Sequence, residues 1–95
     1  MRQYEYLDVD MEAGAYQLVG CFDKFTIPNQ WKVIEATFKE IPPVVVDLKN
    51  VSECDSALIA LLVEVKRQYA NISIINAPDN LIQLLELYQV KTLLF

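Results

Sequence analysis

The chain has no histidine, and its only two cysteines are Cys21 and Cys54. Without histidine or a C-x-x-C spacing, the sequence offers no complete set of metal ligands and no imidazole to activate a nucleophile. Two separated thiols are typical of a chain in a reducing compartment, so we expect both to be buried and unpaired. The sequence predicts no metal site and no cofactor.

Basic residues are also scarce. Eight Lys and Arg stand against 13 Asp and Glu, for a formal net charge of −5, and they form no basic run. Nucleic acids and anionic lipid heads both attract clustered positive charge, so neither is the expected partner. No stretch approaches the roughly 18 apolar residues of a membrane helix, and the first ten residues lack the order of a signal peptide. We therefore expect a cytoplasmic chain, without direct membrane insertion, whose partner is a protein.

Glycine and proline are few, at two and four residues. With 54% hydrophobic and 22% charged residues, the composition fits a compact globular fold and excludes a disordered or low-complexity chain. A chain of 95 residues has material for one core, so we expect residues 1–95 to form a single domain.

In the first half of the chain, apolar residues first alternate with polar ones, as in a strand, and then recur at helical spacing. Alternation over residues 4–9, a turn at 11–14 and a second strand at 15–20 predict an antiparallel hairpin. Thr26 followed by Ile27 and Pro28 predicts a helix start, with Thr26 as its cap. The helix should bury one stripe and end before the two prolines at 42–43, with these residues facing the core: Ile27, Trp31, Ile34 and Phe38.

The second half alternates strands with helices. The β-branched residues 44–46 predict a central strand covered on both faces, followed by a helix from about 55 to 69. Residues 71–75 read as another strand, and 76–78 open a last helix, whose expected core face is Leu81, Leu84, Leu85 and Tyr88. The order β-β-α-β-α-β-α predicts an α/β domain: a mixed sheet of about four strands, an N-terminal antiparallel hairpin and three to four helices.

Asp55 and Ser56 stand between the central strand and the second of these helices, where open sheets of this kind place their sites. Both residue types cap helix N-termini, and residues 52–55 also fit an S-x-x-D capping pattern, so a purely structural role is open. Ser56 has no histidine to activate it, Lys49 is the nearest base in sequence, and no Gly-rich phosphate loop is present. Asp47 and Asp55 are more typical of caps than of a catalytic pair, and we expect no enzyme.

The helix over 55–69 has two apolar faces. One is a sufficient core stripe, formed by Leu58, Leu61, Leu62, Val65 and Tyr69. The opposite side is apolar where a surface helix is normally polar, and it indicates a second contact. We predict a partner-binding site made of Asp55, Ser56, Ile59, Ala60, Val63 and Arg67. The alternative is that neighbouring helices or the C-terminal residues 93–95 cover this side.

These residues resemble the STAS domain family of sulphate transporters and anti-sigma factor antagonists. The pattern of an apolar strand, D-L, a short x-V turn and D-[ST] at a helix start is present as VVVDLKNV at 44–51 followed by Asp55 and Ser56. "LVGCFD" is similar to the family's second strand and its G-x-x-D turn at Gly20 and Asp23. The resemblance runs from about residue 15 to the end.

Within the family the likeness is strongest to the MlaB branch, the small cytoplasmic subunits of the phospholipid-transporting ABC complexes that maintain outer-membrane lipid asymmetry. "CDSALIALLVEVKRQ" is similar to the D-T-x-x-L-A-L-L-L helix of this branch, and "APDNLIQLLELYQV" to its segment ending in Leu-Tyr. The resemblance implies a monomeric, non-catalytic accessory subunit that binds the complex's ATPase and reaches the inner membrane only through it.

The resemblance also gives Ser56 the family's functional hydroxyl. In the anti-sigma factor antagonists that position is phosphorylated, so a phosphorylation-switched antagonist is the alternative function. One residue departs from the pattern: two positions after the hydroxyl the family commonly has Gly, and this chain has Leu58. Leu58 also lies on the predicted core face.

Overall fold

The structure is a computed structural model that describes residues 2–3, 7–10 and 14–94. Most of the predicted turn at 11–14 and residues 4–6 of the predicted first strand lie outside these residues. The strands are β1 (Arg2–Gln3), β2 (Leu7–Asp10), β3 (Ala15–Leu18), β4 (Gly20–Phe22), β5 (Val45–Asp47), β6 (Val51–Cys54) and β7 (Ser73–Ile75). The helices are α1 (Ile27–Glu40), α2 (Ser56–Gln68), α3 (Asp79–Leu87) and α4 (Lys91–Leu94).

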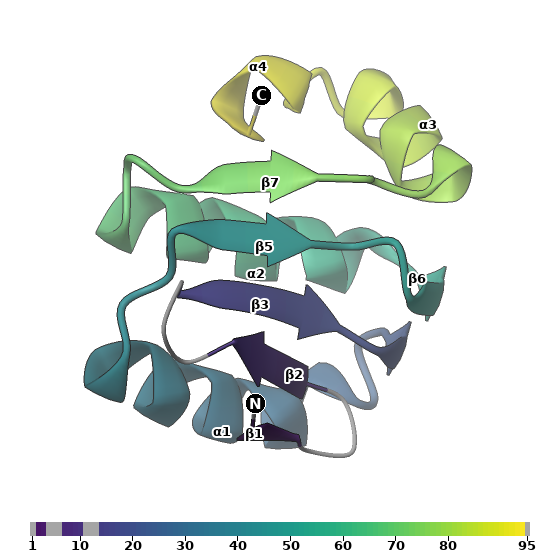
Figure 1. Cartoon of the computed structure of the whole chain (residues 1–95). Coiled ribbons are helices and arrows are strands. Elements are labelled where there is room, and N and C mark those ends of the chain that lie inside the picture. The colour runs from purple at the N-terminus through teal and green to yellow at the C-terminus, as the bar shows by residue number, and fades with distance from the viewer. Residues whose placement is uncertain (1, 4–6, 11–13, 95) are drawn as a thin grey trace.

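Five strands form a mixed sheet in the order β1-β2-β3-β5-β7 (Figure 1). β1, β2 and β3 pair antiparallel, whereas β3, β5 and β7 run parallel. β4 and β6 pair parallel in a separate two-stranded sheet at the carboxyl ends of β3 and β5. The α/β class, the mixed sheet and the antiparallel hairpin are confirmed, with the short strands β1, β4 and β6 added.

The strand predicted at residues 15–20 is wrong at its end, because Gly20 begins β4 instead of ending β3. Gly20 has a φ of +94°, which lets the chain leave the main sheet and start pairing with β6. Gly14 also has a positive φ, of +62°, and a Cβ there would lie 2.9 Å from the carbonyl oxygen of Pro42. The hairpin therefore meets the segment before β5 at a contact that only glycine allows.

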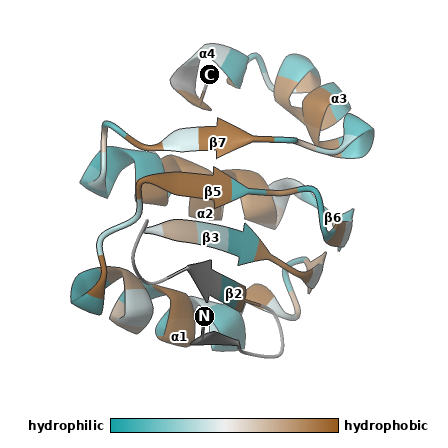
Figure 2. Cartoon of the chain, in the orientation of Figure 1, coloured by the Kyte–Doolittle hydropathy of each residue, from teal (hydrophilic) through white to brown (hydrophobic). Residues whose placement is uncertain are grey.

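The helices α1 and α2 cover one face of the sheet, behind the strands in Figure 1, and α3 and α4 lie beyond β7. Along β3 the side chains of Tyr16 and Leu18 are buried beneath the helices, while Ala15 and Gln17 are only half-buried. No described helix covers this second face, so the prediction that the central strand is covered on both faces is wrong. Figure 2 shows β5 as hydrophobic, turning hydrophilic towards the loop before β6.

The core fills the layer between sheet and helices. Its fully buried side chains come from every part of the fold and include Leu7, Tyr16, Leu18, Phe22, Ile34, Leu48, Leu58, Leu62, Leu81 and Leu85. In α1 the predicted stripe is confirmed at Ile34 and Phe38, but Ile27 and Trp31 are only half-buried. Thr26 does begin α1, yet its hydroxyl makes no cap and bonds instead to the carbonyl oxygen of Cys21 at 3.1 Å.

The C-terminal part holds two helices where one was predicted. In α3, Leu81 and Leu85 are buried as expected and Leu84 is half-buried. Tyr88, assigned to the core face, follows the end of α3 and is 53% exposed, so that assignment is wrong. Gln89 then takes a φ of +57° and turns the chain into α4, whose Leu94 is buried.

Candidate partner-binding site

Asp55 joins two loops at the start of α2. One carboxylate oxygen accepts the backbone N–H of Ala57 at 2.8 Å, which caps the helix, and the other accepts the N–H of Lys24 at 3.2 Å. The backbone N–H of Asp55 donates to the carbonyl oxygen of Phe22 at 3.4 Å. The cap is therefore Asp55 alone. The S-x-x-D reading is wrong, because residues 52–54 belong to strand β6.

Ser56 is the first residue of α2 and its side chain is exposed. Its hydroxyl makes no hydrogen bond with the described residues, since Asp55 already serves as the cap. Ala60 lies one turn further along and is exposed as well. Small side chains at these two positions leave the backbone of α2 open to close approach by another molecule.

Fewer residues are exposed on the outer side of α2 than the sequence predicted. Ile59 retains only 8% of its surface and belongs to the hydrophobic core, and Val63 is half-buried against the same core. Contacts of α2 with α3 and α4 account for this, because these helices lie over that side. The assignment of Ile59 to an exposed stripe is thus wrong, and the alternative that C-terminal helices cover this side is the correct one for Ile59. Whether any of these residues binds a partner stays a prediction.

Arg67 is exposed at the last turn of α2 and is held on its own helix. Its guanidinium donates to both carboxylate oxygens of Glu64, at 3.0 and 2.5 Å, and Gln68 Nε2 donates to the same carboxylate at 2.8 Å. The bonds from Arg67 and Gln68, first that from Arg67, lower the pKa of Glu64 to about 2, and the hydrogen bond to Glu64 raises the pKa of Arg67. Arg67 and Glu64 therefore neutralise each other's charge at the surface of α2.

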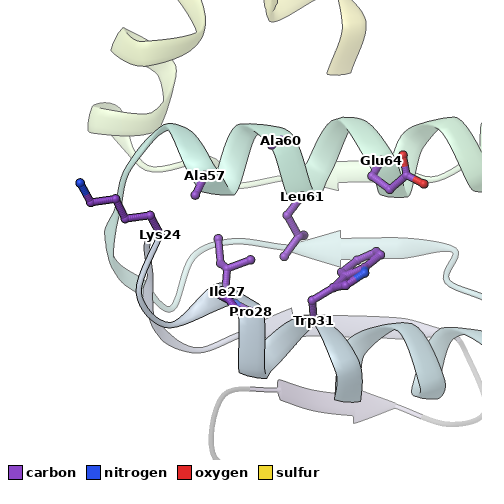
Figure 3. A pocket seen from close by; sticks show the side chains of 8 residues that line it. All are labelled: Lys24, Ile27, Pro28, Trp31, Ala57, Ala60, Leu61 and Glu64. Carbon is purple, nitrogen blue, oxygen red and sulfur yellow. The ribbon is translucent and has the colours of Figure 1, made fainter.

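An apolar groove runs between α1 and α2, with a volume of about 370 Å³ (Figure 3). Ile27, Trp31 and Leu61 point into it from the two helices, while Lys24 and Glu64 stand at opposite ends. Its complete lining is Lys24, Ile27, Pro28, Trp31, Ala57, Ala60, Leu61 and Glu64. We call this the α1–α2 groove. The sequence prediction missed it, because Ile27 and Trp31 had been assigned to the core stripe.

A second hollow lies on the other side of α2, with a volume of about 330 Å³. It is lined by Ser56, Ile59, Ala60, Tyr88 and Val90, and we call it the α2–α3 surface. Ala60 therefore lines both hollows, and the first turns of α2 form a ridge between them. Tyr88, which lines the α2–α3 surface, is a large apolar side chain that stays 53% exposed.

The polar residues weighed as a catalytic pair, Asp47 and Asp55, each hydrogen-bond to loop or helix-start backbone. Asp47 is buried and accepts hydrogen bonds from the backbone N–H of Lys49 at 2.9 Å and from Asn76 Nδ2 at 3.1 Å. Lys49 Nζ lies 3.9 Å from the other Asp47 oxygen. Asp47 thus fastens the loop after β5 to the loop after β7, whereas Asp55 caps α2. The structure does not bring the two carboxylates together as a pair.

Asp23 organises the loop that leads into α1. It accepts the backbone N–H groups of Phe25 and Thr26, at 2.9 and 3.0 Å, and the Cys21 thiol at 3.2 Å. The thiol bond is the main cause that lowers the pKa of Asp23 and raises the pKa of Cys21. The thiols of Cys21 and Cys54 are both free, as predicted, but they are half-buried instead of buried. Among the described residues, no cluster of His, Cys, Asp or Glu could hold a metal ion.

The strand order, the Asp55 cap and the Ser56 helix start agree with the pattern that suggested the STAS family. The family model described as MlaB, STAS domain, matches residues 8–95. The chain belongs to this family. A search of individually curated proteins found no match. Within the part of the chain that the structure describes, no helix is both long and apolar enough to cross a membrane.

One departure from the STAS pattern has a structural explanation. Leu58, the position at which the sequence pattern differs from the one expected for the family, is completely buried in the core, and its backbone N–H donates to the carbonyl oxygen of Asp55 at 3.1 Å. A side chain at this position points away from the ridge formed by Ser56 and Ala60. Leu58 therefore adds to the core without covering the exposed start of α2.

Proposed function

We propose that the chain is a non-catalytic accessory subunit that binds the ATPase of a phospholipid-transporting ABC complex, in the manner that its MlaB-type STAS family implies. The observation that carries the proposal is the exposed start of α2. There Ser56 and Ala60 form a ridge of small side chains that the rest of the described fold leaves uncovered. The complex would hold the chain at the cytoplasmic side of the inner membrane.

The composition of this region supports a protein partner. The exposed ring of Tyr88 lines the same hollow as Ser56 and Ala60, and aromatic side chains are enriched at the buried centres of protein interfaces. The predicted binding residues divide accordingly. Ser56 and Ala60 are available for contact, Asp55 orients the ridge, and Ile59 and Val63 support it from below. Arg67, paired with Glu64, belongs to the rim.

The proposal is tested by copurification from the native host followed by reconstitution. We expect an ABC ATPase to copurify with the chain. The purified chain should hydrolyse no ATP itself, and it should change the turnover of that ATPase when added. Recovery of an anti-sigma kinase in place of an ATPase would refute the proposal, as would ATP turnover by the chain alone.

The matched variants are Ala60→Arg and Ala36→Arg. Both replace an exposed alanine within a helix, but Ala36 lies on α1 and lines neither hollow. A guanidinium on the ridge would be desolvated against the partner, so Ala60→Arg should reduce binding at least about tenfold, whereas Ala36→Arg should bind like the wild type. Equal binding by the two variants would remove the ridge from the interface.

The exposed hydroxyl of Ser56 favours one other function, that of an antagonist switched by phosphorylation. An unbonded serine at a helix N-terminus is accessible to a kinase, and the helix end tolerates the added charge. Under our proposal, Ser56→Ala keeps most of the ATPase binding and Ser56→Glu weakens it. Stoichiometric phosphate on Ser56 in cells, with partner binding lost on modification and regained on its removal, would favour the antagonist instead.

A further inference from the structure

The α1–α2 groove lies next to the ridge of α2 and shares only Ala60 with the predicted binding residues. Its lining is almost wholly apolar, and Trp31 contributes a half-buried ring to it (Figure 3). Ala60 belongs both to this groove and to the α2–α3 surface. A partner seated on the ridge therefore reaches the groove without a gap, because the small side chains of Ala57 and Ala60 let it approach the helix backbone.

The charges at the two ends of the groove are not equivalent. At one end the carboxylate of Glu64 is already bonded by Arg67 and Gln68. At the other end Lys24 Nζ forms no ion pair with the described residues and lies 5.1 Å from the centre of the Phe25 ring. The nearby carboxylates of Asp23 and Asp55 accept backbone N–H groups instead. The one uncompensated charge of the lining is thus the Lys24 ammonium.

From this geometry we infer that the α1–α2 groove receives a segment of the ATPase subunit that carries large apolar side chains followed by a carboxylate. The apolar side chains fill the groove against Ile27, Trp31 and Leu61, and the carboxylate pairs with Lys24 at its end. Complementary charge at a rim speeds association and fixes the orientation of the segment. This inference rests on the proposed function, since it names a second contact made by the same partner.

The sole tryptophan of the chain makes the groove observable, because Trp31 lines it. The chain is labelled with 5-fluorotryptophan, which gives a single fluorine resonance, and is titrated with the purified unlabelled ATPase. We expect this resonance to shift as the complex forms. Sedimentation of the same samples reports independently how much chain is bound.

The charge is tested with Lys24→Glu and its control Lys32→Glu. Both change the net charge equally, and Lys32 is exposed on α1, forms no ion pair with the described residues and does not line the groove. Lys24→Glu should slow association about tenfold and reduce the dependence of the association rate on salt, while Lys32→Glu stays near the wild type.

Ala57→Phe tests the groove itself, because it places a ring in the lining. It should weaken binding without moving the thermal midpoint as far as a core substitution does.

The outcomes separate this inference from the function on which it rests. An unchanged Trp31 resonance in a sample that sedimentation shows to be bound would overturn the groove contact and leave the accessory function standing. The same holds if Lys24→Glu and Lys32→Glu associate at equal rates while Ser56→Glu, at a position that lines only the α2–α3 surface, weakens binding. No association between the wild-type chain and the ATPase in any assay would refute both.

Discussion

Asp55 shows how one side chain prepares the proposed binding surface. Its two carboxylate oxygens hold two different segments, the first turn of α2 through Ala57 and the loop before α1 through Lys24. The same residue therefore begins the helix that carries Ser56 and fixes the loop that carries the end of the α1–α2 groove. Because Asp55 satisfies the helix N-terminus, the neighbouring hydroxyl of Ser56 stays available.

The first residue-scale prediction concerns these two hydrogen bonds of the Asp55 carboxylate. Asp55→Ala should lower the free energy of unfolding by about 1–2 kcal/mol, because it removes a helix cap as well as the bond to Lys24. Asp55→Asn keeps an oxygen that can accept from Ala57 and should lose less. Urea denaturation of both variants measures the difference. If the alanine variant were as stable as the wild type, the cap would have no energetic role.

A second prediction follows from the Glu64 carboxylate. Its pKa is lowered from 4.5 to about 2 by the bonds from Arg67 and Gln68. A group whose pKa is lowered by folding stabilises the native state above its unfolded pKa, and that stabilisation is lost as the pH falls from about 4.5 through about 2. Carboxyl carbon chemical shifts should place the Glu64 midpoint well below that of an exposed glutamate. Arg67→Ala should raise the midpoint towards the ordinary value; an unmoved midpoint would contradict the assigned cause.

At the scale of the element, α2 has three environments instead of two. Leu58, Leu62 and Val65 are buried in the core. Ile59 is buried on the side where α2 contacts α3 and α4, and in the first turns of α2 the ridge with Ser56 and Ala60 remains exposed. Adjacent residues therefore differ sharply in what they tolerate. This arrangement replaces the prediction that Ile59 belongs to the outer, partner-binding side of the helix.

The pair Ile59→Glu and Ala60→Glu tests that division with the same new residue at neighbouring positions. Ile59→Glu should cost at least the roughly 2–5 kcal/mol of a large core truncation, and burial of its carboxylate adds to this. Ala60→Glu places the same charge in solvent and should unfold near the wild-type midpoint, while still weakening partner binding. Circular dichroism melts compare them directly. Two equal midpoints would show that Ile59 is not part of the core.

The features of α2 that the sequence predicted are those set by residues near one another in the chain, and the missed features depend on packing between distant segments. The start of α2 at Asp55 and its core stripe were predictable, because capping chemistry and helical periodicity are local. The burial of Ile59 and the exposure of Tyr88 were not, since both depend on where α3 and α4 pack after the turn at Gln89. The α1–α2 groove was missed for the same reason: periodicity places Trp31 on an inner face but does not give the separation of two helices.

At the scale of the whole molecule, the core is continuous from the hairpin to the C-terminal helix. Leu7 in β2, Leu62 in α2 and Leu85 in α3 belong to the same buried cluster, and α2 contacts α1, α3 and α4. The ridge lies on α2, whose buried residues Leu58, Ile59 and Leu62 belong to this cluster. Loss of packing anywhere in the core should then disturb the binding surface as well.

The last prediction is that residues 1–95 unfold as one cooperative unit. Leu85→Ala removes a fully buried side chain from α3 and should cost about 2–5 kcal/mol, lowering the thermal midpoint by more than about 8 °C. Trp31 lies in α1, on the other side of α2, so its fluorescence reports on a distant part of the fold. In a single domain the Trp31 transition must move together with the helical circular dichroism signal, since α1 cannot keep its core once α3 has left. If Trp31 kept its wild-type midpoint while part of the helical signal melted early, α3 and α4 would form a separate unit, and the single-domain proposal would be wrong.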